Sequence, residues 1–393
     1  MRDLPPLFLT TPDHSGREDL SDYLRRGGYG RLQGLAGQAI VAAADAAGLR
    51  GRGGSGRGEP LAAKLHAVAA AGSATGLRYV VANGAETSPG SKKDRLLMER
   101  FPHRILAGAV AAARAVNAST VYLYVKASAT EARTSMEAAV NELAGAGLSD
   151  LPAFEVYRAP DSAVAGEETA VCDAIEGFEG RPQVKPPTPD TAGILGRPTL
   201  IANVETLAAL AAVVSTGPTA ATTALFTLSG DVARPGVYEL PLGTSLRALI
   251  ADYGGGATGE IVAVLPGGFR SGPLTPQELD LPLDYDALQE ADTTLGSAHV
   301  IVLASPNSLK DLMAGALDLA AVGSCRQCEI CAEGTATLRN LAGRIAAGTE
   351  PEAPLRDQLD AWSTILHGKG NCMYLTGVAL LTRRAVRQFP TWG

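Results

Sequence analysis

The chain has 393 residues, of which 46% are hydrophobic and 19% are charged, and its net charge is −7. This length predicts roughly two or three globular domains, and the negative charge gives no support for nucleic-acid binding, which favours a basic surface. No apolar run is long enough to predict a signal peptide or a membrane span, so the sequence predicts a soluble, cytoplasmic protein.

The first informative segment is a glycine-rich loop near the N-terminus. Apolar residues with helical spacing occupy residues 19–26 and 37–47, and a loop with glycine at positions 48, 51, 53, 54, 56 and 58 follows them. Glycines at this density let the backbone approach a ligand closely and direct N–H groups toward a phosphate. A helix is predicted from Pro60 onward. The loop alone is a weak signal for a phosphate site, and a flexible linker is the alternative.

Strands and helices then alternate, which predicts a parallel sheet covered by helices. Strands are predicted at 77–82, 120–126 and 154–158, and helices through 98–116 and at 130–144. Asn83 and Glu86 follow directly after the first of these strands. Ligands of open α/β sheets bind at the carboxyl ends of the strands, so both residues are candidate binding groups.

Gly166, Glu167 and Glu168 open a further helix, predicted to extend to about residue 176. Acidic residues in the first turn of a helix interact favourably with its dipole, so simple capping also explains the pair. Residues 196–207 are predicted to lead into an apolar helix.

The sequence pattern changes near residue 216. A hairpin is predicted from residues 224–232 and 236–240, followed by a short helix at 245–252 and strands at 260–265 and 298–303. This order is typical of a small β-grasp module. Residues 308–393 are predicted to be helical, with helices at 309–322, 333–346 and 378–389. The predicted domains are therefore residues 1–216, 217–304 and 305–393.

Four of the five cysteines form a set with the spacing of a metal site. Cys325, Cys328 and Cys331 follow each other at three-residue steps, and Cys372 lies further along the chain. One tight loop with three thiolates and a distant fourth cysteine is an arrangement that holds a [4Fe–4S] cluster, and such a set indicates a reducing compartment. A zinc site or a chance group of buried thiols are the alternatives. Cys172 lies outside the set and is interpreted as a small buried hydrophobe. The five histidines are scattered and are interpreted as surface or core residues.

Taken together in chain order, these motifs resemble the NADH-binding flavoprotein subunit of respiratory complex I and the related diaphorase subunits of NAD-linked hydrogenases and formate dehydrogenases. The resemblance spans nearly the whole chain. Its motifs are Tyr23–Tyr29, Gly48–Gly54, Asn83 with Glu86, Lys93–Arg95, Gly166–Ala170, Ile175–Gly177, Lys185–Pro187, Asn203–Thr206 and Ser324–Cys331. It implies an α/β fold in which an FMN-binding parallel-sheet domain precedes a β-grasp module of the SLBB type and a helical bundle with one iron–sulfur cluster.

The resemblance also implies the residues around each cofactor. The candidate flavin contacts are Gly51, Gly53, Gly54, Asn83, Glu86, Gly166, Glu167, Glu168, Asn203 and Thr206. Glu168 and Lys185 are placed where dinucleotide contacts are expected. In the family, NADH passes a hydride to FMN, and the cluster removes the electrons singly because it accepts one at a time.

Several positions depart from the family's usual pattern. A stacking aromatic residue is replaced by Arg57, a basic residue near FMN by Ala62, a glutamate expected at the nicotinamide by Ser88, and an aromatic residue expected against adenine by Thr188. Lys64 is close in sequence to the lost basic residue. Aromatic pairs contribute about 0.5–1.5 kcal/mol each beyond area burial, so losing two weakens NADH binding by roughly tenfold to a hundredfold.

Three functions follow from the sequence. The first is an NADH-oxidising redox subunit that passes electrons through FMN to the cluster and on to a partner. The second is an electron-transfer subunit that has lost NADH binding and relays electrons between protein partners, with flavin optional. The third is a scaffold or a zinc-stabilised interaction module. The predicted partners are other redox subunits, a ferredoxin-like protein or a membrane-bound electron acceptor, the last placing the chain at the membrane periphery.

Overall fold

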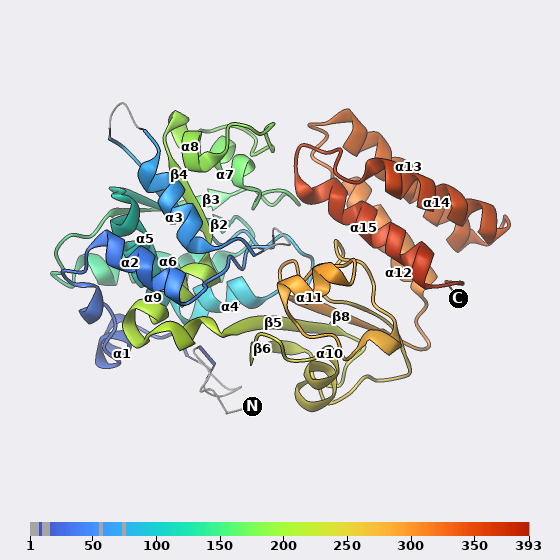
Figure 1. Ribbon diagram of the computed structural model, residues 1–393, viewed down its shortest axis with the longest axis horizontal. Helices are drawn as coiled ribbons and strands as arrows, with labels where there is room; N and C mark the ends of the chain where they lie inside the picture. The colour runs from blue at the N-terminus through green and yellow to red at the C-terminus, as the bar shows by residue number, and fades with distance from the viewer. Residues whose placement is uncertain (1–7, 10–15, 55–57, 73–75, 393) are drawn as a thin grey trace.

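The computed structural model describes residues 8–9, 16–54, 58–72 and 76–392, and its elements form two sheets and a group of C-terminal helices (Figure 1). This order confirms the predicted fold class, an α/β domain followed by a β-grasp-like module and a helical bundle. Arg57, one of the departures from the family pattern, lies outside the described residues. None of the helices in the described ranges is both long and apolar enough to cross a membrane.

The first sheet is entirely parallel and has the strand order β3-β2-β1-β4. Its strands are β1 (Tyr79–Asn83), β2 (Thr120–Lys126), β3 (Ala153–Ala159) and β4 (Thr199–Asn203). The sequence predicted the first three, but the interpretation of residues 196–207 as a lead-in to a helix missed β4. This strand is five residues long and is followed at once by an apolar helix, so hydrophobic periodicity does not separate the two.

Nine α-helices accompany this sheet among the described residues. They are α1 (Leu20–Arg25), α2 (Gly37–Ala46), α3 (Leu61–Ala70), α4 (Lys93–Arg100), α5 (Pro102–Val116), α6 (Thr130–Ala144), α7 (Glu168–Ile175), α8 (Pro189–Ala192) and α9 (Val204–Thr216), with short 3₁₀ turns η1 (Gly30–Leu32) and η2 (Ile194–Gly196). The single helix predicted through residues 98–116 was wrong. The helix is interrupted at Phe101, because a proline disfavours helical backbone in the residue before it. Pro102 itself fits the first turn of α5.

Alternate residues of the strands pack on opposite faces of the first sheet. Val80 and Leu200 join the large core formed with α5 and α9, whereas Val81 and Ile201 face α7. Helices α5 and α9 approach so closely that a Cβ on Gly108 would lie 1.8 Å from the carbonyl oxygen of Leu207. This packing fixes the helix that starts at the end of β4, and therefore the position of that strand end.

The second sheet has the order β6-β5-β8-β7, with β5 and β8 parallel and the other pairs antiparallel. Its elements are η3 (Pro218–Ala221), β5 (Thr223–Gly230), β6 (Gly236–Pro241), α10 (Leu246–Ala248), the π-helical turn η4 (Leu249–Tyr253), β7 (Ile261–Leu265), η5 (Pro276–Glu278), α11 (Tyr285–Glu290) and β8 (His299–Ala304). The predicted hairpin of β5 and β6 is confirmed.

Four helices end the described chain: α12 (Leu309–Val322), α13 (Glu329–Ala347), α14 (Glu352–Leu366) and α15 (Met373–Gln388). They pack against one face of the second sheet, since Ile301 and Leu303 of β8 join the helical core while Val300 and Val302 join the core on the other face. Helix α13 begins four residues earlier than predicted and α15 five residues earlier. Each therefore starts beside a cysteine, Cys328 or Cys372.

Candidate functional site

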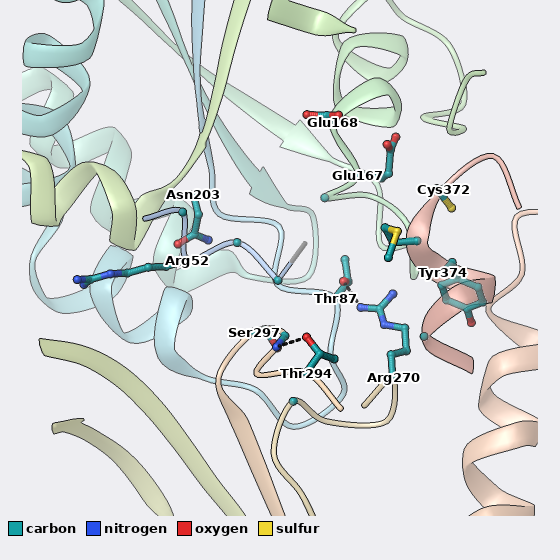
Figure 2. Close-up of a pocket in the computed structure, with 18 of the residues that line it drawn as sticks. Arg52, Thr87, Glu167, Glu168, Asn203, Arg270, Thr294, Ser297, Cys372 and Tyr374 are labelled. Atoms are coloured by element: carbon teal, nitrogen blue, oxygen red, sulfur yellow. Dashed lines mark hydrogen bonds between the residues drawn. The ribbon is translucent and has the colours of Figure 1, made fainter. Parts of the chain in front are cut away.

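A cavity of about 540 Å³ lies where the α/β domain, the second sheet's loops and α15 meet (Figure 2). Its volume is within the range of small-molecule and cofactor sites. The structure brings together on its wall all eleven residues predicted to bind a cofactor: Gly51, Gly53, Gly54, Asn83, Glu86, Gly166, Glu167, Glu168, Lys185, Asn203 and Thr206. Cys372 lines the same cavity.

The glycine-rich loop forms one wall and is held by backbone contacts. The Arg52 N–H donates to Thr206 Oγ1 at 2.9 Å, and the Gly51 N–H donates to the Glu59 carbonyl at 2.8 Å. A Cβ on Gly53 would lie 3.3 Å from the Asn203 Cβ, and Gly54 has φ +88°, in the left-handed region that favours glycine. The loop can therefore bring its backbone against a ligand at the strand ends, as a flavin site of this kind needs.

Two asparagines mark the carboxyl ends of neighbouring strands. Asn83 of β1 and Asn203 of β4 are paired in register, and Asn203 Nδ2 donates to the Asn83 carbonyl at 3.3 Å. Asn83 Nδ2 donates to the Gly166 carbonyl at 2.9 Å, while Asn203 Oδ1 caps α9 by accepting from the Glu205 N–H. The strand ends and the loop before α7 are thus joined at the position where α/β sheets bind ligands.

A cluster of paired charges stands at the α7 side of the cavity. Glu167 caps α7, and Lys185 Nζ lies 2.7 Å from Oε1 of both Glu167 and Glu168. Lys64 of α3 reaches Glu168 Oε2 at 3.5 Å. Burial alone would raise the pKa of Glu168, but the ammonium groups of Lys64 and Lys185 lower it below its ordinary value. Glu168 is therefore an ionised acceptor, suited to hydroxyl groups of a ligand.

Beneath the glycine-rich loop lies a fully buried network of four charges. Lys93 Nζ contacts Asp94 Oδ1 at 2.7 Å and Glu205 Oε2 at 2.9 Å, and Arg52 Nη1 contacts Glu205 Oε1 at 3.0 Å. Burial raises the pKa of Asp94 to about 7, although Lys93 opposes this shift. Asp94 Oδ2 accepts from Asn203 Nδ2 at 2.7 Å, so the network fixes the side chain at the carboxyl end of β4.

Apart from Cys372 and His367, the residues that the second and third domains contribute to the cavity were not singled out in the sequence. Thr294 and Ser297 come from the loop before β8, Arg270 from the loop after β7, and Tyr374 from α15 (Figure 2). Arg383 of α15 also lines the cavity. The two adjacent glycines after β7 were the available signal, because glycines at a strand end let another backbone approach. His367 also lines the cavity. Its place five residues before Cys372 left open a hydrogen bond near the cluster, although a surface or core residue was the favoured interpretation.

The four cysteines of the predicted cluster lie at one end of the helical bundle. Cys331 is buried in the first turn of α13, Cys372 is the N-cap of α15, and all four are in the helical core or pack against it. Burial raises the pKa of Cys331 to about 12, and the charges of Cys328, Cys372 and Cys325 contribute in the same direction. The set thus lies in and against one core, and soft thiolates suit iron.

No group of three or more His, Cys, Asp or Glu side chains within the described ranges is placed as the ligands of one metal ion. A cubane does not require such convergence, because each of its four irons takes a different cysteine. The donor set of Cys325, Cys328, Cys331 and Cys372 fits that group in type and number. Cys172, buried in α7, belongs to another part of the fold.

Three of the four departures from the family pattern can be located. Ala62 is buried in α3, while Lys64 lines the cavity and supplies a positive charge near the position lost at residue 62. Thr188 lines a second cavity of about 420 Å³ that shares Lys64 and Glu168 with the first. Ser88 is buried within the protein, and its neighbour Thr87 lines the cavity instead.

Ser88 is held by a histidine of the second sheet. Its Oγ lies 3.2 Å from His299 Nδ1, and the Nε2 of the same ring lies 2.8 Å from Ser229 Oγ. His299 is 1% exposed, and this burial lowers its pKa to about 4. A neutral histidine therefore links the loop after β1 to β5 and β8.

We expect His299 to make stability depend on pH. In the unfolded chain the histidine has its ordinary pKa of about 6.5, so between pH 6.5 and about 4 the unfolded state binds a proton that the folded state does not. The free energy of unfolding should fall by about 1–2 kcal/mol as the pH is lowered from 6.5 to about 5. Urea unfolding of His299→Gln, whose amide keeps hydrogen-bonding capacity, should show a flatter pH profile. Parallel profiles for the two proteins would contradict this assignment.

Three family models match consecutive parts of the chain. Residues 44–212 match the Nuo51 FMN-binding domain, residues 225–264 match the SLBB domain, and residues 311–392 match the iron–sulfur binding region of NADH-ubiquinone oxidoreductase F. Their order is that of the α/β domain, the second sheet and the helical bundle. The FMN-binding match contains every predicted cofactor contact, and the iron–sulfur match contains the four cysteines of the set.

Relatives of known identity match nearly the whole chain. It is 34% identical to the NADH-quinone oxidoreductase F 2 subunit of Rhizobium meliloti (strain 1021), covering 98% of this chain and 96% of that protein. It is 30% identical to the NADH-quinone oxidoreductase F subunit of Escherichia coli (strain K12), covering 94% and 88%. A chain of the H2-reduced NAD+-reducing [NiFe]-hydrogenase superposes with a TM-score of 0.84 at 30% identity over 93% of this chain, which spans 63% of the hydrogenase chain. The chain therefore belongs to the family of the NADH-quinone oxidoreductase F subunits.

Proposed function

We propose that this chain oxidises NADH at an FMN held in the 540 Å³ cavity and passes the electrons through a [4Fe–4S] cluster to a protein partner. The observation that carries the proposal is the position of Cys372. It lines the cavity that contains the predicted flavin contacts, and it also belongs to the cysteine set of the helical bundle. The flavin and the cluster that takes its electrons would therefore lie on either side of one cavity wall.

Different residues of the cavity would bind FMN and the dinucleotide. Backbone groups of Gly51, Gly53 and Gly54, together with Asn83 and Asn203, would hold FMN at the strand ends. Glu168, ionised beside two lysines, would accept hydrogen bonds from hydroxyl groups of the dinucleotide. Bound FMN supplies the conversion between a two-electron hydride and single electrons. Cys325, Cys328, Cys331 and Cys372 would each bind one iron of the cluster.

A second function is favoured by the changed dinucleotide positions. Ser88 replaces a carboxylate expected at the nicotinamide, and its hydroxyl faces His299 within the protein. Thr188 offers no aromatic surface for adenine. An electron-transfer subunit that receives electrons from a protein partner, with NADH binding lost, is consistent with both observations. In either function the partner is another redox subunit, as the names of the relatives as subunits support.

Anaerobic absorbance and EPR spectra of the reconstituted protein separate these functions. We expect NADH to bleach the flavin absorbance and to produce the EPR signal of a reduced cluster. Dithionite, which reduces both groups without a dinucleotide site, is the control. Bleaching by dithionite and none by NADH would contradict NADH oxidation and support the second function. Absence of iron and flavin after reconstitution would contradict both and leave the scaffold.

A further inference from the structure

Arg270 differs from every other lysine and arginine in the described lining of the cavity. Arg52 pairs with Glu205, Lys64 and Lys185 pair with Glu168, and Arg383 pairs with Asp292. Arg270 forms no ion pair with a carboxylate among the described residues. Its charge is therefore not neutralised locally, as the charges of the others are.

The contacts of Arg270 are with neutral groups from three segments. Nη2 donates to Thr87 Oγ1 at 2.9 Å, and Nη1 donates to the Ala163 carbonyl at 3.3 Å. The guanidinium carbon lies 5.3 Å from the centre of the Tyr374 ring, within the range of a cation–π contact. These partners fix the position of the guanidinium without cancelling its charge.

This position is between the cavity and the cysteine set. Figure 2 shows the guanidinium between Thr87 on one side and Tyr374 with Cys372 on the other. Helix α15 lies against the same residue, because a Cβ on Gly377 would be 2.7 Å from the Arg270 Cβ. Tyr374, whose ring contacts the guanidinium, is two residues from Cys372, and Arg270 and Cys372 line the same cavity.

We propose that the unpaired positive charge of Arg270 raises the reduction potential of the cluster to which Cys372 is a ligand. A cluster bound by four thiolates gains one further negative charge when it accepts an electron. A fixed cation nearby stabilises that reduced state more than the oxidised one, because Coulomb attraction grows with the charge. Charge and hydrogen bonding near a cluster are the features by which proteins set its potential.

This inference rests on the proposed function, since it requires the cluster at the four cysteines. The EPR-monitored midpoint potential of the reconstituted protein tests it. In Arg270→Gln, which keeps hydrogen-bonding groups but removes the charge, we expect a shift to more negative potential that corresponds to at least a tenfold change in the reduction equilibrium, about 59 mV for one electron. Arg270→Lys keeps the charge and should remain near the wild type.

Arg339→Gln is the matched control within the helical domain. Arg339 lies on α13 but is exposed and paired with Asp318 at 2.7 Å, so its removal should leave the potential unchanged. Iron and flavin contents of each variant equal to wild type establish that the fold is intact. An unchanged potential in Arg270→Gln, or an equal shift in Arg270→Lys or Arg339→Gln, would overturn the inference and leave the proposed function standing. A wild type without a cluster signal would overturn both.

Discussion

Replacing Lys93 by methionine is expected to lower the free energy of unfolding by about 3–5 kcal/mol. Lys93 is fully buried, and its ammonium group contacts the carboxylates of Asp94 and Glu205. Without it, Arg52 is the remaining cation in a network with two buried carboxylates. Uncompensated charge in a protein interior costs far more than a surface ion pair contributes. Urea unfolding followed by circular dichroism measures the difference.

Lys92 provides a matched control one residue away. Its side chain is exposed, and its backbone N–H is the group that donates to Thr227 Oγ1. Lys92→Met should therefore change the stability by less than about 0.5 kcal/mol. The pKa of Asp94 is already raised to about 7, above its ordinary value, so acidification protonates it in the folded state first. Because Lys93 opposes this rise, its removal raises the pKa of Asp94 further, so the variant binds this proton at higher pH than the wild type does. The deficit of Lys93→Met should therefore be largest at high pH and narrow as the pH falls toward about 7, below which Asp94 is protonated in both folded proteins. Equal losses in the two variants would contradict the role assigned to the network.

Replacing Cys372 by alanine is expected to abolish the EPR signal of the [4Fe–4S] cluster and to reduce the bound iron sharply. The other three cysteines lie between the end of α12 and the first turn of α13, whereas Cys372 alone supplies a thiolate from the start of α15. A cubane without its fourth protein thiolate exposes one iron, which is readily lost. Flavin binding should persist, because Cys372 contributes only one side chain to a large cavity wall.

The fifth cysteine of the chain is the control for this experiment. Cys172→Ala removes a buried thiol from α7, where it packs with residues of the first sheet. It should keep its iron and its EPR signal. Iron, sulfide and zinc analysis of anaerobically prepared proteins checks the result. Loss of zinc and not of iron from Cys372→Ala would instead support the zinc-stabilised alternative.

The motifs of the cofactor site could be predicted because their chemistry is local in sequence. The cysteine spacing, the glycine-rich loop and the polar ends of strands each carry a signal within a few residues. Asn83 was located by its place after a strand, and the structure puts it in register with Asn203. Conversely, Arg270 and Tyr374 reach the cavity only through the packing of three domains. No local pattern contains that information.

The comparison at residues 87 and 88 shows the same limit at single-residue scale. The sequence interpreted Ser88 as a lost carboxylate, on the resemblance to the family pattern. In the structure the Ser88 side chain is hydrogen-bonded to His299. Thr87 lines the cavity instead and accepts a hydrogen bond from Arg270. Arg270, more than 180 positions from Thr87 in the sequence, therefore supplies the positive charge at this part of the cavity wall. Only tertiary structure could place it there.

The buried carboxylate of Glu205 has a consequence for how the chain can be divided. Glu205 belongs to α9, but its Oε1 accepts from the N–H of Leu225 in β5 at 2.9 Å. Arg52, its partner, donates to the carbonyl of Ala221 in η3 at 3.2 Å. The flavin-binding region thus completes its own interior with backbone groups of the next module. These two hydrogen bonds cross the predicted domain boundary between residues 216 and 217. A chimaera that exchanges the β-grasp module must therefore preserve these two backbone partners. Without them, the buried charges of Glu205 and Arg52 would lose hydrogen bonds beneath the glycine-rich loop.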